Sequence, residues 1–131
     1  MVTCSSFFRG DFMKDKTIQE VLKFRDDRNW KPYNNPKDMA ISISLEAAEL
    51  LEVFQWSASD TQCLDKIDQI KEELADVMIY CIEMADVCGL DIDTIIHEKV
   101  LKNAEKYPVE PCKEGIDTYY ALKEDYRTKH K

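Results

Sequence analysis

Two segments of the chain place an acidic residue inside an apolar helical stripe, and this pattern constrains the fold more than any other feature of the sequence. Successive residues of a helix are rotated by about 100° around its axis. In the first segment, residues 39–53, three apolar residues lie within roughly 40° of Glu46 around that axis, namely Met39, Leu50 and Val53. Glu49 lies about 60° to one side. A helix over this segment therefore carries one acid in its apolar face and a second at the edge of that face.

The second segment repeats the arrangement. Four apolar or aromatic residues lie within roughly 40° of Glu73, namely Val77, Tyr80, Met84 and Val87. Asp76 lies about 60° to the same side, whereas Glu72 and Glu83 fall further round the helix and are expected to face solvent. The two segments thus carry matching pairs of acids at the same angular positions relative to their apolar stripes.

Acids in such positions need a compensating positive charge. A buried carboxylate is costly, and several close together repel one another. The helical segments offer few cationic partners at matching positions. A hard divalent cation resolves the conflict, because Mg²⁺ prefers oxygen ligands and completes its shell with water and phosphate oxygens. A single Glu beside an apolar stripe is more often a solvated helix-edge residue, but two pairs in phase favour a metal site.

The rest of the sequence predicts an all-α protein. With only 3 Gly and 4 Pro in 131 residues, helical patterns run almost without interruption. We expect helices over about residues 17–29, 36–55, 62–88 and 91–107. Asn35 is expected to cap the second helix, Gly89 to end the third, and Asp91 or Asp93 to cap the fourth before Pro108. Four helices with short connections predict a four-helix bundle.

The predicted fourth helix places polar residues on an apolar face. Lys99, Asn103 and Lys106 are spaced i, i+4 and i+7, which puts them on one side of a helix. The same face carries three isoleucines, Ile92, Ile95 and Ile96. Either lysine can neutralise phosphate oxygens, and Asn103 can donate a hydrogen bond to them. The alternative is that both lysines are solvated and extend past their apolar neighbours.

Charge and cysteine content exclude several classes of function. The net charge of −8 argues against a large nucleic acid partner, because phosphate repulsion opposes binding without a basic face. A small polyphosphate can still bind through a divalent cation. The five cysteines include no CxxC pair, and Cys81 and Cys88 are expected to be small core residues of a reducing compartment. No apolar run is long enough to span a membrane, so we expect a cytoplasmic protein.

At these residues the chain resembles the MazG-like all-α nucleotide pyrophosphohydrolases, in particular their dCTP pyrophosphatase-like branch. The matching pieces follow the family order over about residues 17–108: Arg28-Asn29-Trp30, Leu45 to Leu50 with Phe54-Gln55-Trp56, Glu72 to Val77 with Ile79-Tyr80, and Lys99 through Asn103 to Lys106-Tyr107-Pro108. One ExxE motif is weak evidence, whereas the ordered set is specific. The family often has a Glu before the first acid, where this chain has Leu45, a departure that the dCTP pyrophosphatase-like branch shares in kind.

The resemblance implies a Mg²⁺ site and a reaction. The metal ligands would be the four acids Glu46, Glu49, Glu73 and Asp76. A (deoxy)nucleoside triphosphate would be hydrolysed between its α- and β-phosphates to the monophosphate and pyrophosphate, in nucleotide-pool house-cleaning with dCTP-like substrates. Glu46 or Glu49 would take the proton from the attacking water. In this reading residues 1–16 are a loose leader, residues 17–108 the MazG-like catalytic domain, and residues 109–131 a short helix or a mobile tail.

The resemblance also implies a nucleotide pocket and an oligomer. Trp30, Trp56 and Tyr80 would line the pocket, and Lys99 and Asn103 would face phosphate. Asn34 stands where relatives carry another base- or sugar-contacting side chain. The tryptophans could instead cap the core. We expect a homodimer or homotetramer, because a unit this short has more aromatic residues than one core needs.

Two other functions fit some of these features. A nucleotide sensor or a helical interaction module would keep the fold and leave the acidic cluster idle. Incubation with a panel of dNTPs and Mg²⁺ distinguishes these functions from an enzyme: turnover indicates an enzyme, and tight binding without products indicates a sensor. A ferritin-like di-iron bundle requires ExxH motifs, and neither His97 nor His130 follows a suitable Glu by three residues.

Overall fold

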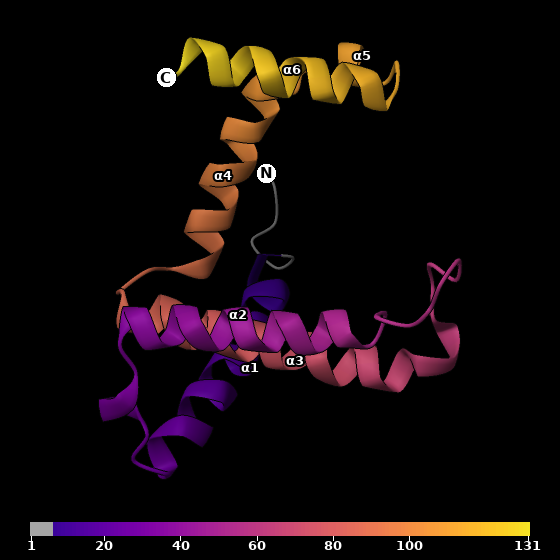
Figure 1. Ribbon diagram of the computed structural model, residues 1–131. Coiled ribbons are helices and arrows are strands. Elements are labelled where there is room, and N and C mark those ends of the chain that lie inside the picture. Colours follow the sequence, from indigo (N-terminus) through magenta and orange to yellow (C-terminus); the bar gives the residue numbers. More distant parts are fainter. Residues whose placement is uncertain (1–6) are drawn as a thin grey trace. The chain divides into compact units, whose positions relative to one another are not determined.

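A computed structural model describes residues 7–131, with side chains from Lys16 onward, and these residues form helices joined by turns, with no strand among them (Figure 1). The all-α prediction is therefore confirmed for this part of the chain. No helix in the same range has the length and hydrophobicity needed to span a bilayer. The chain divides into two compact units, Met1–Leu90 and Asp91–Lys131.

The first unit contains three long helices, α1 (Phe7–Asp27), α2 (Pro36–Glu52) and α3 (Ile67–Val87), with one-turn 3₁₀ helices at Lys31–Tyr33 and Leu64–Lys66. The first helix begins at Phe7 instead of near residue 17, so the expected loose leader is helical from that point. The remainder of the leader, residues 1–6, lies outside the described part of the chain.

Local sequence signals set the ends of α2 and α3. Asn35 caps α2, because its side chain accepts a hydrogen bond from the backbone N–H of Asp38 at 2.9 Å, and a proline occupies the first helical turn. The chain leaves α3 through Gly89, whose φ of 65° lies in the left-handed region. There the N–H of Leu90 donates to the carbonyl of Ala85 at 2.8 Å, as in a Schellman C-terminus.

Helices α2 and α3 lie side by side, and α1 packs against α3 (Figure 1). The core between them is small, and its buried apolar residues are Met39, Val53, Cys63 and Ala85. Met39 and Val53 come from the apolar stripe predicted around Glu46. The expectation of core cysteines at Cys81 and Cys88 is wrong, since both are exposed. Cys88 is the C-cap of α3.

Glu83 is buried, at 7% exposure, and not solvated as expected. The reason is that α1 covers this end of α3, which the helical periodicity of α3 alone does not reveal. Arg25 of α1, only 1% exposed, lies there with ion pairs to Asp26 at 2.8 Å and to Asp86 at 2.7 Å.

The second unit contains α4 (Ile92–Lys106), the single-turn α5 (Val109–Cys112) and α6 (Ile116–Lys129). Asp91 caps α4 as expected, accepting from the backbone N–H of Thr94 at 2.8 Å. Residues 109–131 therefore contain a long helix, α6, which α4 meets through the stacked rings of Tyr107 and Tyr119. Neither unit holds four long helices among its described residues, so the four-helix bundle stays a prediction.

Candidate functional site

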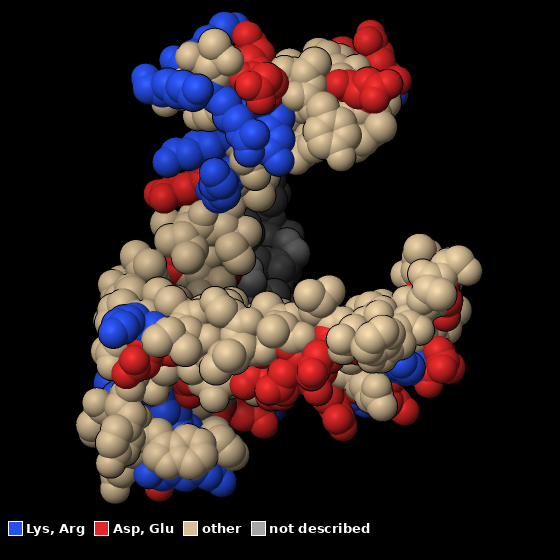
Figure 2. Space-filling view, in the orientation of Figure 1, with Lys and Arg blue, Asp and Glu red and all other residues tan. Residues whose placement is uncertain are grey.

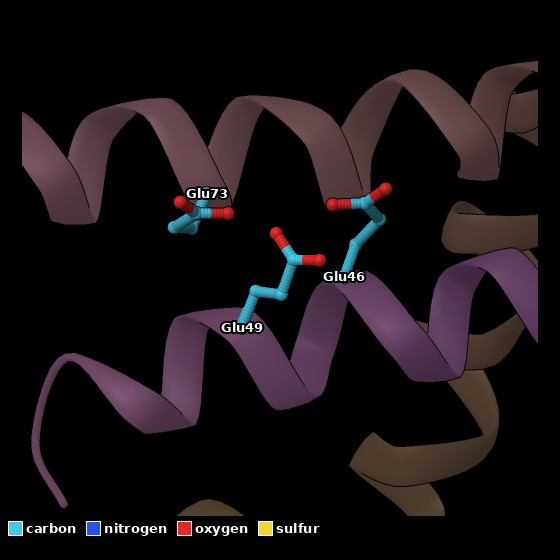
Figure 3. A group of neighbouring side chains, drawn as sticks. All are labelled: Glu46, Glu49 and Glu73. Atoms are coloured by element: carbon cyan, nitrogen blue, oxygen red, sulfur yellow. The ribbon is translucent and has the colours of Figure 1, made fainter.

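Three of the four predicted metal ligands converge between α2 and α3. Glu46 and Glu49 extend from α2 toward α3, where Glu73 meets them (Figure 3). One carboxylate oxygen from each of the three lies within 4.8 Å of the others. Glu46 and Glu73 are half-buried and Glu49 is exposed. The in-phase acid pairs of the two helices thus face one another across the helix pair.

The carboxylates of this group perturb one another. Burial raises the pKa of Glu46, and the negative charges of Glu49 and Asp76 raise it further. Burial likewise raises the pKa of Glu73, followed by the charges of Glu49, Asp76 and Glu46. Asp76 is exposed and lies outside the group of three, yet its charge acts on both Glu46 and Glu73. All four predicted ligands therefore share one region of negative potential.

The donor set fits a hard divalent cation. Oε2 of Glu73 is buried and has no hydrogen-bond partner, which is a costly state for a carboxylate oxygen unless a ligand completes it. Three carboxylates within reach of one point offer only oxygen donors, the set that Mg²⁺ prefers and that soft metals do not. The group can therefore hold a metal ion.

A cavity of about 670 Å³ opens beside these acids in the first unit. Four of the predicted site residues line it, namely Trp30, Asn34, Asp76 and Tyr80. Asp76 links the cavity to the carboxylate group, because it acts electrostatically on that group and also lines the cavity wall. Burial and the charges of Glu46, Glu83 and Asp76 raise the pKa of Tyr80, so its hydroxyl remains protonated and able to donate.

Aromatic side chains form part of the cavity wall. Phe24 and Trp30 meet edge to face with ring centroids 6.0 Å apart, and the Arg28 guanidinium lies 3.6 Å from the Phe24 ring centroid. Trp30 is half exposed, and Tyr33 follows it in the wall. Trp56 does not line the cavity and is 85% exposed. The structure therefore brings Trp30, but not Trp56, to the cavity.

The predicted phosphate-binding residues belong to α4, in the second unit. Lys99 and Asn103 are exposed. Lys106 is half-buried, with its Nζ 4.6 Å from the ring centroid of Tyr126 on α6. Lys and Arg side chains gather over α4 and α6, whereas Asp and Glu gather along α2 and α3 (Figure 2).

Periodicity did not identify every residue of the cavity wall. Six residues of the wall were not predicted as site residues although they carry polar or aromatic groups: Glu20, Phe24, Tyr33, Asp38, Ser42 and Glu83. The sequence did contain a signal for Glu83. This acid follows the predicted site residue Tyr80 by three residues, and the same spacing separates the predicted site residues Glu46 and Glu49. Phe24 and Glu20 come from α1, whose placement against α3 is a tertiary feature.

Known proteins share sequence and fold with this chain. The model of the MazG-like family matches residues 41–121. Two proteins named dCTP pyrophosphatase 1 are similar in sequence, that of Mus musculus at 29% identity over 75% of this chain and that of Homo sapiens at 25% over 87%. This chain spans 63% of the mouse protein and 72% of the human one. A pyrophosphatase of known structure from Archaeoglobus fulgidus is 36% identical, with a TM-score of 0.64, over 74% of this chain and 94% of that one.

Proposed function

This chain belongs to the MazG-like family, and we propose that it is a Mg²⁺-dependent pyrophosphohydrolase that converts (deoxy)nucleoside triphosphates to the monophosphate and pyrophosphate. The observation that carries the proposal is the carboxylate group of Glu46, Glu49 and Glu73, within 4.8 Å of one another and coupled through Asp76 to a 670 Å³ cavity. The names of its relatives, dCTP pyrophosphatase and pyrophosphatase, support the reaction type.

Each acid has a role in the proposed reaction. When bound by Glu46, Glu49, Glu73 and Asp76, Mg²⁺ supplies neutralisation and orientation of the triphosphate. Glu46 or Glu49 removes a proton from the attacking water while its oxygen bonds to the α-phosphorus. The bond from that phosphorus to the oxygen bridging to the β-phosphate breaks, and pyrophosphate leaves with the electron pair.

The remaining predicted residues bind the nucleotide. Trp30 offers a stacking surface for the base, and the protonated hydroxyl of Tyr80 and the amide of Asn34 offer hydrogen bonds within the same cavity. Lys99, Asn103 and Lys106 are proposed to contact the phosphates, where a cationic side chain forms strong hydrogen bonds. Trp56 is proposed to be a further stacking residue, in a nucleotide pocket that a neighbouring protomer of the oligomer completes.

The active form is proposed to be a homodimer or homotetramer built around a four-helix bundle. Exposed apolar residues follow one stripe of α3 at helical spacing, Ile67, Leu74, Met78 and Cys81, and α2 exposes Ile41 and Leu45. An exposed apolar surface on a pair of helices favours burial against a partner. Because a second copy presents the same surface, pairing the two α2–α3 hairpins would complete four helices.

The biological role follows from the reaction class. Hydrolysis of nucleoside triphosphates to monophosphates removes unwanted nucleotides from the pool. Such house-cleaning agrees with the cytoplasmic location expected from the sequence.

The direct test incubates the purified protein with a panel of natural dNTPs and NTPs and Mg²⁺, followed by chromatography for monophosphate and a pyrophosphate assay. We expect equal molar amounts of both products. Glu49→Ala and Asp76→Ala should abolish the activity with helical content intact, whereas Glu72→Ala, an exposed acid of the same helix, should retain it.

Two outcomes contradict the proposal. Full activity in both the Glu49→Ala and Asp76→Ala variants would remove the carboxylate group from the mechanism. Tight nucleotide binding by the intact protein without any product would identify a nucleotide sensor instead of an enzyme.

A further inference from the structure

The cavity of the first unit holds a buried acid that the proposed hydrolysis does not use. Glu83 lines the cavity and is 7% exposed. Among the described side chains, none forms a hydrogen bond or an ion pair with its carboxyl. Arg25 is the nearby cation, but its Nε and Nη1 already bind Asp26 and Asp86. Glu83 therefore offers the cavity a carboxylate acceptor to which no described side chain donates.

The position of Glu83 matches the far end of a bound nucleotide. Asp76 lies beside the carboxylate group and Glu83 follows it by seven residues on the same helix. At 1.5 Å per residue this separates the two by about 10 Å along α3. Tyr80 lies between them in sequence, and the negative charges of both acids raise the pKa of its hydroxyl. With phosphates at the Asp76 end, the base of a nucleotide extends toward Glu83.

A second unpartnered group completes the pattern. Nδ2 of Asn34 is buried, lines the same cavity and has no hydrogen-bond partner. The wall thus includes an acceptor, Glu83, and an unpaired donor, Asn34, beside the rings of Phe24 and Trp30. Buried polar groups are normally satisfied, so a ligand with one donor and one acceptor on an aromatic body fits this wall.

Nucleobases differ in the hydrogen-bond donors and acceptors at their edges. Cytosine carries an amino donor at position 4 and a carbonyl at position 2, and guanine also carries an amine and a carbonyl on one edge. When position 4 of a pyrimidine lies against Glu83, uracil and thymine present a carbonyl where cytosine has its amine, so that two acceptors face one another. Their N3–H donor lies at the neighbouring position and does not replace the amine in this orientation. Adenine has the amine but no carbonyl. An acceptor–donor wall therefore distinguishes the bases.

We propose that Glu83 is a specificity-determining residue that accepts a hydrogen bond from the exocyclic amine of the base, while Asn34 donates to a base carbonyl. The inference rests on the proposed hydrolysis for the orientation of the nucleotide, with its phosphates at the carboxylate group. It selects substrates whose base carries both an amine and a carbonyl, and it rejects uracil and thymine.

The test measures kcat/KM for dCTP, dGTP and dUTP in the wild type, Glu83→Gln and the control Glu72→Gln. It is run at pH 8, because burial raises the pKa of Glu83 and a higher pH favours its ionised form. We expect the wild type and Glu72→Gln to prefer dCTP over dUTP at least tenfold. Glu83→Gln should reduce this preference to within about threefold, because an amide both donates and accepts. Comparable kcat/KM values for dCTP and dGTP indicate that an amine and a carbonyl on the base suffice for recognition. A preference for one of the two indicates that the cavity also selects the base by its size.

A binding measurement separates this inference from the proposed reaction. Calorimetry in EDTA should show that the wild type binds dCMP more tightly than dUMP and more tightly than dCMP with a dimethylated 4-amino group, which lacks the donor. This substrate-side comparison needs no variant to fold. Failure to distinguish the three monophosphates, or an unchanged dCTP to dUTP ratio in Glu83→Gln, overturns the role of Glu83 and leaves hydrolysis untouched. Absence of hydrolysis of every triphosphate overturns the proposed function, and the monophosphate comparison then decides the inference alone.

Discussion

The guanidinium of Arg25 on α1 donates from Nη1 to Oδ2 of Asp86 on α3 at 2.7 Å, across 61 residues of sequence. Arg25 is 1% exposed, and the Asp86 side chain is 29% exposed. This ion pair joins α1 to the end of α3 that carries Glu83. It therefore helps to form the wall of the cavity as well as the core of the first unit.

Arg25→Met should destabilise the protein strongly. The methionine retains much of the side-chain volume, but Asp26 and Asp86 lose the hydrogen bonds from their shared cation, and a hydrogen bond to a charged group contributes about 1.5 kcal/mol or more. Urea unfolding followed by circular dichroism measures the loss. The control is Lys23→Ala, which removes an exposed pair with Asp27 and should change the free energy of unfolding by less than about 0.5 kcal/mol. Equal effects of the two substitutions would contradict a structural role for Arg25.

The metal-free protein should become more stable as pH falls from 8 toward 5.5. Burial and neighbouring acids raise the pKa of Glu46 and Glu73 above the unfolded values, so the folded state binds more protons than the unfolded state as pH falls toward the folded pKa values. The gain in the free energy of unfolding appears as pH falls through the pKa values of the folded state and is complete near the pKa values of the unfolded state. Thermal melts in EDTA at both pH values measure it. Below this window the lowered pKa of Asp26, set by its hydrogen bond from Arg25, acts in the opposite direction.

The same melts provide a matched variant and a metal test. Glu73→Gln removes one of the repelling charges, so it should raise the Tm at pH 8 and flatten its pH dependence. Mg²⁺ should raise the Tm of the wild type at pH 8, because it binds only the folded state, and should raise the Tm of Glu73→Gln less. A wild type that is more stable at pH 8 than at pH 5.5 in EDTA contradicts the electrostatic picture.

Lys99→Ala should lower kcat/KM for triphosphates by about tenfold or more, since a charged hydrogen bond contributes about 1.5 kcal/mol or more. Steady-state kinetics with dCTP and Mg²⁺ measures the effect. Lys113→Ala removes another exposed lysine of the second unit, one paired with Glu110, and should leave kcat/KM unchanged. If Lys99→Ala also retains full kcat/KM, α4 does not contact the phosphates through this residue.

Leu74→Glu should dissociate the oligomer. Leu74 is 46% exposed in the single chain, and a carboxylate placed in an apolar interface loses its hydration without a partner. Light scattering coupled to size-exclusion chromatography gives the mass. Glu72→Lys changes an exposed residue on the opposite side of α3 from Leu74 and should keep the wild-type mass. A monomeric wild type would show that the exposed stripes do not pair two copies.

Gly89→Ala should cost about 1 kcal/mol, because the left-handed φ of 65° is unfavourable for a residue with a Cβ. No atom lies within 4 Å of the added Cβ position, so the cost is one of backbone conformation and not of packing. The reciprocal change Ala58→Gly, at φ 52°, should stabilise by about 0.5 kcal/mol. Urea unfolding of both variants measures the difference, and the same sign for both would contradict this account.

The local features of the fold could be predicted from the sequence. Asn35 and Asp91 cap helices because their short side chains accept from backbone N–H groups that have no helical partner. Gly89 ends α3 for an equally local reason. The acid pairs of α2 and α3 could be predicted as well, since Glu46 and Glu73 repeat one phase relative to their apolar stripes and helix packing then brings such faces together.

The sequence by itself thus determined the helical segments of α2, α3 and α4, the caps at Asn35 and Asp91, the stop at Gly89, and the meeting of Glu46, Glu49 and Glu73. Each of these depends on interactions within a helix or on the phase of a single stripe. Only the tertiary structure decided that Glu83 is buried, that Arg25 pairs with Asp86, and that Trp30 lines the cavity while Trp56 does not. These features depend on where α1 packs against α3. The position of one helix against another is set by the summed burial of many side chains, and no periodicity within one segment contains it.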